Sequence, residues 1–265
     1  MWNSLFYLLS SEAGEPYQLE WMAYVMVLMG LLSFLFSLFV NVPYGRYASS
    51  KFGFPVSVKL AWFLQELPSL LVPIHVVVFT AADRSSYLTN QVLIGMFLCH
   101  YIQRTLVYPF LIRGGKPTPF ISFAMAFMFC VYNGYMQGKY LSHFAVYPSD
   151  WIRHPCFITG FSLWLTGILI NVHSDHILRN LRKPGDTGYK IPNGGMFEYI
   201  SGANFFGEII EWTGFAIATW SLQGAAFAIF TFLVLSSRAT QHHRWYIEKF
   251  EDYPKSRKAF IPFLY

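Results

Sequence analysis

The sequence predicts an all-α integral membrane protein with seven transmembrane helices, a luminal N-terminus and a cytoplasmic C-terminus. Apolar residues make up 54% of the 265 residues and charged residues only 12%, about half the charged fraction of an average soluble domain. Such a chain has too few polar residues to cover a surface that faces water. Apolar stretches of about 20 residues, the length that crosses a bilayer core, recur along the chain, and positive charges gather in alternate connections between them.

The predicted spans cover residues 20–41, 56–80, 89–111, 119–143, 157–178, 203–220 and 223–238. The whole chain, 1–265, is expected to form a single seven-helix membrane domain. Residues 1–19 form its luminal N-terminal tail, and residues 239–265 form its cytoplasmic C-terminal tail. No short apolar segment with a cleavage site precedes the first span, so no removed signal peptide is expected.

The distribution of Lys and Arg gives the orientation. Cytoplasmic loops of membrane proteins collect positive charge. Fourteen of the 19 Lys and Arg residues fall in the first, third and fifth loops and the C-terminal tail, and none precedes the first span. The fifth loop, residues 179–202, also contains many Gly, Pro and Arg residues, so it is expected to fold over an anionic group on the cytoplasmic side.

Six ionisable residues lie in or at the ends of the predicted spans. At about 2.5 to 3.5 kcal/mol each for a helix centre, they would cost on the order of 15 kcal/mol together if they faced lipid. They are therefore expected to face inward and to be paired, and such residues are functional candidates by default. The six are Lys59, Glu66, Arg104, Asp175, Glu208 and Glu211.

Helical spacing groups these residues with other polar side chains on four helix faces. Four such faces can line a polar cavity, with arginines for phosphates and with amides and carboxylates for hydroxyl and amide groups. From the residues alone, a cofactor or nucleotide cavity, an ion or substrate pathway, and plain contacts between helices all remain open. The faces are Tyr101, Arg104 and Tyr108; Asn171, Asp175, Leu178 and Arg182; Asn204, Glu208 and Glu211; and Arg238, His242 and Tyr246.

Local motifs exclude several site types. The run Arg113-Gly-Gly-Lys116 lacks the spacing of a phosphate-binding loop, and Gly194-Gly195 is not a dinucleotide fingerprint. The eight histidines cluster too sparsely for a di-iron oxygenase, so no metal is expected, and no nucleic-acid partner is expected either. The three cysteines have no paired spacing, which excludes a disulfide scaffold.

Seven segments carry a resemblance to a known family. They are AWFLQELPS at 61–69, HYIQRTLVY at 100–108, NVHSD at 171–175 with ILRNLRKPG at 177–185, YKIP at 189–192, SGAN at 201–204, GEIIEW at 207–212 and FEDYPKSR at 250–257. Together they resemble the steroid 5α-reductase family, the 3-oxo-5α-steroid 4-dehydrogenases, over about residues 42–265. The segments at 113–117, 185–188 and 173–176 resemble the type 1 branch of that family.

The resemblance implies a seven-helix oxidoreductase of the endoplasmic reticulum membrane that uses NADPH from the cytosol. It implies hydride transfer to C5 of 3-oxo-Δ4-steroids such as testosterone and progesterone, with the steroid and the lipid bilayer as partners. Residues matching the family's contacts to the steroid C3 ketone are Glu66 and Tyr101, and Phe129 and Trp212 fall where the family lines its steroid pocket. Residues matching its dinucleotide site are Tyr44, Arg104, Tyr108, Lys116, Asn171, Asp175, Arg182, Tyr189, Lys190, Asn204, Glu208, Arg238, His242 and Tyr246.

The chemistry that this implies suits these side chains. Hydride addition at C5 drives negative charge onto the C3 oxygen, and the neutral phenol of Tyr101 can donate a proton to it. Glu66 can either position Tyr101 or, when protonated, bind the ketone, and the sequence leaves both roles open. The Arg and Lys residues of the cytoplasmic loops favour NADPH over NADH because of its extra phosphate.

Three alternatives remain beside this interpretation. Related membrane reductases act on polyprenols, enoyl thioesters or sterols. The C-terminal His242-His243 and the segment FEDY at 250–253 also resemble membrane isoprenylcysteine methyltransferases, which would bind S-adenosylmethionine. A seven-span receptor or transporter would account for the spans and the buried charges without any turnover.

Overall fold

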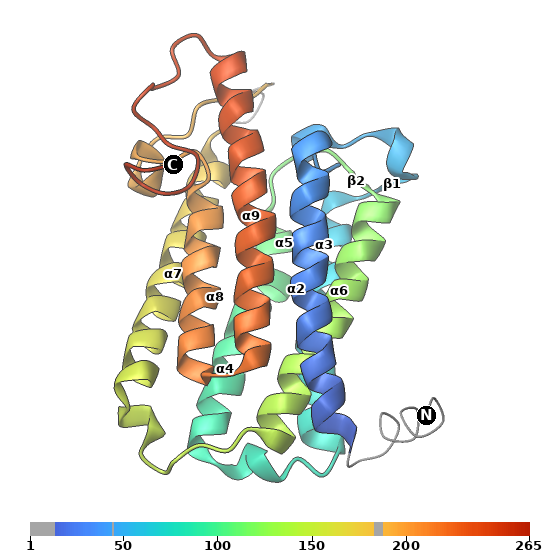
Figure 1. Ribbon diagram of the computed structural model, residues 1–265. Helices are drawn as coiled ribbons and strands as arrows, with labels where there is room; N and C mark the ends of the chain where they lie inside the picture. The colour runs from blue at the N-terminus through green and yellow to red at the C-terminus, as the bar shows by residue number, and fades with distance from the viewer. Residues whose placement is uncertain (1–13, 44, 183–187) are drawn as a thin grey trace.

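The structure is a computed structural model that describes residues 14–43, 45–182 and 188–265. The described chain is a bundle of helices that run roughly along one axis (Figure 1). The helices are α2 Glu15–Phe39, α3 Val58–Phe79, α4 Leu88–Ile102, α5 Tyr108–Leu111, α6 Phe120–Lys139, α7 Pro155–Asn180, α8 Ala203–Thr219 and α9 Leu222–Lys249. The strands β1 Pro55–Val56 and β2 Thr118–Pro119 form a short antiparallel pair. The predicted all-α class is confirmed.

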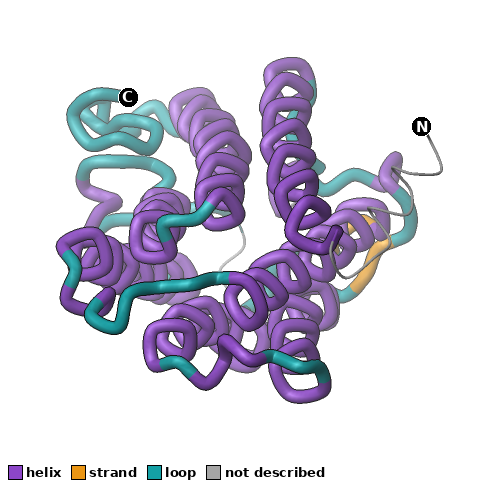
Figure 2. The backbone as a smooth tube through the Cα atoms, turned by 60° about the horizontal axis from the view of Figure 1, so that its bottom comes forward, coloured by secondary structure: helices purple, strands orange, loops and turns teal. Residues whose placement is uncertain are grey.

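Each predicted span overlaps a helix, and four helices are long and apolar enough to cross a membrane: α2, α3, α7 and α9. The predicted third span corresponds to α4 and α5, which a π-helical turn at Gln103–Val107 joins without a break. An integral membrane protein is therefore supported, whereas seven crossings and the orientation of the termini stay predictions. Figure 2 shows the bundle with its lower end turned toward the viewer, where the helices lie side by side and loops join their ends.

Several helices extend beyond the predicted spans, because backbone hydrogen bonding continues after the apolar stretch ends. Helix α2 begins at Glu15, inside the predicted N-terminal tail, and α9 continues to Lys249, well into the predicted C-terminal tail. Hydropathy falls at the first charged residues, but backbone hydrogen bonding continues through a polar helix that leaves the apolar layer. Helix α7 ends at Asn180, so Arg182 lies beyond the helix face on which spacing had placed it.

Glycines bring α7 and α8 into backbone contact. Gly160 and Gly167 on α7 face Gly214 and Gly207 on α8, and a Cβ added at Gly167 would overlap the backbone of Glu211 and Gly207. Small residues at a helix interface allow such close approach in membrane proteins. The polar ends of α7 and α8 therefore lie directly against each other.

Candidate functional site

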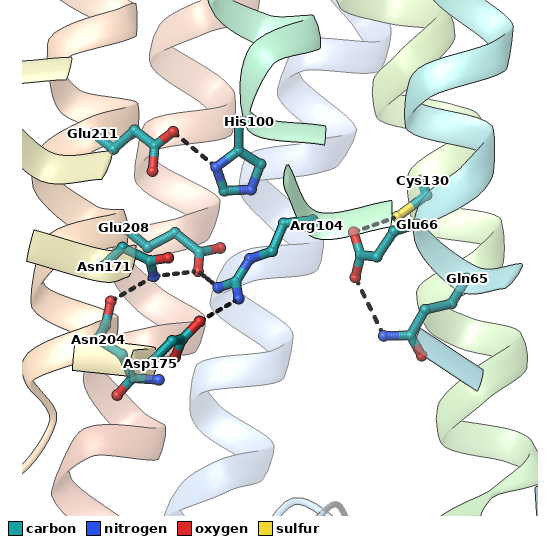
Figure 3. Close-up of polar contacts among 10 residues, drawn as sticks. All are labelled: Gln65, Glu66, His100, Arg104, Cys130, Asn171, Asp175, Asn204, Glu208 and Glu211. Carbon is teal, nitrogen blue, oxygen red and sulfur yellow. Dashed lines mark hydrogen bonds and ion pairs between the residues drawn. The ribbon is translucent and has the colours of Figure 1, made fainter. Parts of the chain in front are cut away.

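Arg104 is the centre of a buried ion-pair cluster (Figure 3). Its Nη1 lies 2.8 Å from Asp175 Oδ2 on α7, and its Nη2 lies 2.6 Å from Glu208 Oε2 on α8. The Arg104 residue is 5% exposed. Buried charges are tolerated when they are paired and hydrogen-bonded, so this guanidinium and its two carboxylates form one electrostatic unit.

Asn171 extends this cluster along α7. Its amide Nδ2 donates to the backbone oxygen of Asn204 at 2.9 Å and lies 3.4 Å from Glu208 Oε2. The structure thus brings together Arg104, Asn171, Asp175, Asn204 and Glu208, which we call the arginine–carboxylate cluster. Helical spacing had placed Asn171 with Asp175 on one face of α7, and Asn204 with Glu208 on one face of α8. In the structure these two faces meet at Arg104.

The π-helical turn gives Arg104 its position. This turn covers Gln103–Val107 and directly follows α4, and such turns are frequent at functional sites. The guanidinium of Arg104 also lies over the rings of Tyr108 and Trp62, with centroid distances of 5.0 and 5.6 Å. The predicted face of Tyr101, Arg104 and Tyr108 is therefore not a regular α-helical stripe, although Arg104 and Tyr108 are neighbours.

Glu66 lies on α3, across from the arginine–carboxylate cluster, with neutral hydrogen-bond donors. Its Oε1 accepts from Gln65 Nε2 at 3.2 Å, and its Oε2 accepts from the Cys130 thiol at 3.6 Å (Figure 3). The charges of Arg104 and Glu208 act on this carboxyl group. Glu66 is therefore held by an amide and a thiol, within the electrostatic field of the ion-pair cluster.

Tyr101 is buried beside Glu66 and against an aromatic wall. Its residue exposure is 3%, and Glu66, Cys130 and Ser69 are among the polar groups that act on its phenol. The ring centroid of Tyr101 lies 4.7 Å from that of Phe97 and 6.0 Å from that of Trp212. The Tyr101 hydroxyl therefore lies near the polar side chains of Glu66, Cys130 and Ser69, and the Tyr101 ring packs against the aromatic side chains.

Trp212 and Phe129 belong to the same aromatic wall. Phe227 links them, because its ring centroid lies 4.4 Å from that of Trp212 and 6.2 Å from that of Phe129. Phe129 also stacks on Phe230 at 4.3 Å. Sequence reasoning missed Phe97, Phe227 and Phe230, since single phenylalanines in an apolar span carry no local signal.

Glu211 pairs with a residue that its helical spacing did not identify. It is fully buried, and its Oε1 lies 2.7 Å from Nδ1 of His100 on α4. It was expected on one face with Glu208, but one helical turn separates the two carboxylates and each turn of α8 meets a different partner. His100 was missed because adjacent Tyr101 and Arg104 carried the signal.

The prediction of inward-facing, paired charges is wrong for Lys59. This residue is exposed in the first turn of α3. A long lysine side chain at a helix end can place its ammonium group in the polar boundary while its stem covers apolar surface. Lys139, also within a predicted span, pairs with Glu15 at 3.1 Å.

A second cluster combines cations with aromatic rings near the end of α9. The guanidinium of Arg46 lies 4.2 Å from the ring centroid of Trp245, 4.7 Å from that of Tyr246 and 5.3 Å from that of Tyr189. The guanidinium of Arg182 lies over the Tyr189 ring, 5.0 Å from its centroid. We call these five residues the cation–aromatic cluster. The buried Nη1 of Arg46 has no hydrogen-bond partner among the described residues.

Further predicted residues surround the cation–aromatic cluster. His242 packs against Phe205 and Tyr47 with centroid distances of 5.3 and 6.0 Å, and Lys116 Nζ donates to the backbone oxygen of Arg46 at 3.2 Å. Burial raises the pKa of Tyr47 above its ordinary value, so its neutral hydroxyl donates to the backbone oxygen of Gln241 at 3.0 Å.

Arg238 connects the two clusters. Its charge acts on Glu208 of the arginine–carboxylate cluster and on His242 beside the cation–aromatic cluster. Lys190 is exposed in the loop between α7 and α8, and predicted Tyr44 lies outside the described residues. Sequence reasoning assigned Arg46 only to topology and did not select Trp245, although Trp245 follows Arg238 at a spacing that places both on one helix face.

The C-terminal segment, residues 250–260, ties down the loop between α7 and α8. Arg257 Nη1 donates to the backbone oxygen of Pro192 and Nη2 to Asn193 Oδ1, each at 2.7 Å. Ser201 Oγ is hydrogen-bonded to Tyr253 Oη at 2.6 Å, and burial raises the pKa of Tyr253, so this phenol stays protonated. The same loop carries Tyr189 into the cation–aromatic cluster.

One groove on the bundle lies away from both clusters. It has a volume of about 590 Å³ between α8 and α9, and its lining includes Trp220, Ile229 and Phe232. A single chamber that joins Tyr101, the ion pairs and the cation–aromatic cluster therefore stays a prediction. Within the described part of the chain, no three His, Cys, Asp or Glu residues converge as a metal site.

Fold and site together define a helical membrane protein with a buried polar site beside an aromatic wall. Residues 116–265 match the family described as 3-oxo-5-alpha-steroid 4-dehydrogenase, and the chain belongs to this family. It is 58% identical to 3-oxo-5-alpha-steroid 4-dehydrogenase 1 of Rattus norvegicus over 96% of this chain and 98% of that protein.

Two human relatives place the chain within the family. It is 56% identical to the Homo sapiens protein of the same name over 97% of this chain and 99% of that protein. It is 48% identical to Homo sapiens 3-oxo-5-alpha-steroid 4-dehydrogenase 2 over 86% of this chain and 91% of that protein. The resemblance inferred from the sequence segments is confirmed.

Proposed function

We propose that this chain is an NADPH-dependent reductase that saturates the 4,5 double bond of 3-oxo-Δ4-steroids to give 5α-reduced steroids. The observation that carries the proposal is the position of Tyr101, which is buried beside Glu66 and against the aromatic wall. A flat apolar ligand fits an aromatic surface, and a ketone fits a hydroxyl donor. The relatives are named 3-oxo-5-alpha-steroid 4-dehydrogenases, which supports the same substrate class.

The two clusters suit a dinucleotide chemically. The buried Arg46 Nη1 is a donor that no described residue satisfies, and phosphate oxygens are the acceptors that arginine binds most strongly. Tyr189 and Trp245 offer aromatic faces for a base. Asn171 and Asp175 offer amide and carboxylate groups for ribose hydroxyls and a carboxamide, so the residues fit NADPH.

Bound NADPH supplies the hydride that reduces C5. The phenol of Tyr101 donates its hydrogen bond, and then its proton, to the C3 oxygen as negative charge grows there. The resulting enol then takes a proton from water at C4 while its hydroxyl proton returns to the Tyr101 phenolate, which restores the C3 ketone and completes the saturated product. Glu66 lies beside that phenol with neutral donors at both oxygens, so it acts by orienting Tyr101 or, when protonated, by binding the ketone itself.

The test is mass spectrometry of testosterone incubated with detergent-purified protein and NADPH. We expect a product that is heavier by two hydrogens, none without NADPH, and a much slower reaction with NADH. Reduction of a polyprenol, an enoyl thioester or a sterol, with testosterone left unchanged, would assign the chemistry to one of the related reductases. Ligand binding without any consumption of NADPH would instead support a receptor or transporter.

The proposed site opens toward the cytosol from the endoplasmic reticulum membrane. The cation–aromatic cluster lies at the end of α9 where the chain also terminates, and α2 begins at the opposite end (Figure 1). Positive charge collects on the cytoplasmic side of membrane proteins. In sealed microsomes, a membrane-impermeant thiol reagent should therefore label a cysteine introduced at Lys255 and spare one introduced at Arg84.

A further inference from the structure

A small basic pocket lies beside the C-terminal part of α9, where that helix leaves its apolar stretch. It is on the side of α9 that faces away from the proposed dinucleotide site. Its volume is about 260 Å³, and it is lined by Thr240, His243, Arg244, Lys258, Ala259, Leu264 and Tyr265. At 100° per residue, Thr240 and Arg244 lie on the face of α9 opposite His242. The pocket is therefore separate from the cation–aromatic cluster.

Two cations at this pocket lack acidic partners. Neither Arg244 nor Lys258 forms an ion pair with any described residue. His243 also lines the pocket, and its Nδ1 is hydrogen-bonded to Ser201 Oγ at 2.6 Å. Two cations without ion-pair partners around one concavity favour an anion with several oxygens.

Apolar side chains beside the pocket indicate the source of that anion. Leu264 is 78% exposed and Phe263 is 76% exposed, and both follow the segment that carries Lys258. The apolar part of α9 ends just before Thr240, since Arg238 is the first charged residue of that helix. The pocket thus lies at the level where phospholipid head groups meet acyl chains, and basic pockets at that level bind anionic head groups.

We propose that this pocket binds the phosphate of an anionic phospholipid head group. Arg244 and Lys258 neutralise the charge, while Phe263 and Leu264 contact the acyl chains. The lipid would hold the C-terminal segment against α9. The site is independent of the proposed reductase activity, because none of the residues proposed for catalysis or dinucleotide binding lines it.

The test is native mass spectrometry of the detergent-purified full chain titrated with dioctanoyl phosphatidylglycerol. The double variant Arg244→Gln with Lys258→Gln should bind this lipid roughly tenfold to thirtyfold more weakly than the wild type. The backbone N–H and oxygen of Lys258, which bond to Tyr199 and Ser201, are unchanged by this substitution. The charge-preserving pair Arg244→Lys with Lys258→Arg should retain binding, which separates a lost charge from a lost fold.

The matched control removes two exposed lysines elsewhere, Lys51→Gln with Lys255→Gln, and should bind as the wild type does. Equal weakening in this control would overturn the pocket in favour of general surface charge. Equal affinity for dioctanoyl phosphatidylcholine would overturn the preference for an anionic lipid. If inorganic phosphate displaced the phosphatidylglycerol at a concentration equal to that of the lipid, the pocket would be a site for free phosphate and not for a lipid head group. Saturation with NADP⁺ should leave lipid binding unchanged.

Discussion

The substitution Arg257→Gln tests how the C-terminal segment controls the loop between α7 and α8. Arg257 donates two hydrogen bonds of 2.7 Å, one to the backbone of Pro192 and one to the side chain of Asn193. This loop carries Tyr189 against Arg46. Loss of the guanidinium should therefore loosen one wall of the cation–aromatic cluster without touching Tyr101 or Glu66.

The magnitude follows from the two bonds. Hydrogen bonds to charged groups contribute about 1.5 to 3 kcal/mol each, so the gross loss is at most about 6 kcal/mol. Backbone bonds from Ser201 to Lys258 and from Gly202 to Ala259 remain, and glutamine can keep one contact. A loss of about 2 to 3 kcal/mol corresponds to roughly 30- to 150-fold more frequent local opening.

Hydrogen–deuterium exchange of peptides from residues 188–198 measures this opening directly. We expect those amides to exchange roughly 30- to 150-fold faster in Arg257→Gln, with NADPH affinity lowered and turnover at saturating NADPH nearly kept. Arg257→Lys keeps the charge but not the forked geometry, so its effect should be intermediate. Lys255→Gln, an exposed neighbour, is the control. Unchanged exchange in Arg257→Gln would refute the anchoring role.

Three further predictions concern the pair Tyr101 and Glu66, the contact between α7 and α8, and the cation–aromatic cluster. Tyr101→Phe and Glu66→Gln should each lower turnover on the order of a hundredfold, and near-normal steroid reduction by folded protein would remove them from catalysis. Gly167→Ala should lower the melting temperature by about 3 to 10 °C in a thermal-shift assay, because its Cβ would overlap α8, whereas Gly95→Ala meets no atom within 4 Å and should not. Arg46→Gln should weaken NADPH binding about tenfold by fluorescence titration, since it removes a charged phosphate donor; unchanged affinity would place the phosphates elsewhere.

The helices were predictable because hydropathy and helix formation are both local properties. Every predicted span overlaps a helix, and the breaks between spans coincide with real loops. Helix ends were less predictable, since α9 remains helical to Lys249 although its apolar stretch ends near Arg238. The number of membrane crossings depends on a bilayer that lies outside the chain, so neither sequence nor fold determines it alone.

The site was predictable where one helix carries several polar groups at a regular spacing. Asn171 and Asp175 on α7 meet Arg104 and Glu208 because burial forces each charge toward a partner. Partners across the bundle were not predictable from spacing alone. Glu211 on α8 pairs with His100 on α4, and these residues lie 111 positions apart in the chain, so no periodicity within α8 identifies the partner.

The charges of the two clusters orient the proposed dinucleotide. Arg104 faces two carboxylates, so its positive charge is already balanced by acidic partners within the arginine–carboxylate cluster. Arg46 and Arg182 converge on Tyr189, so the phosphates belong at the cation–aromatic cluster. In the proposed complex, the uncharged hydrogen-bonding groups of ribose and carboxamide would then bind beside Arg104, on the side of the bundle where Tyr101 lies. A reductase needs its hydride donor next to its proton donor, and the proposed orientation would meet that requirement without any phosphate-binding loop.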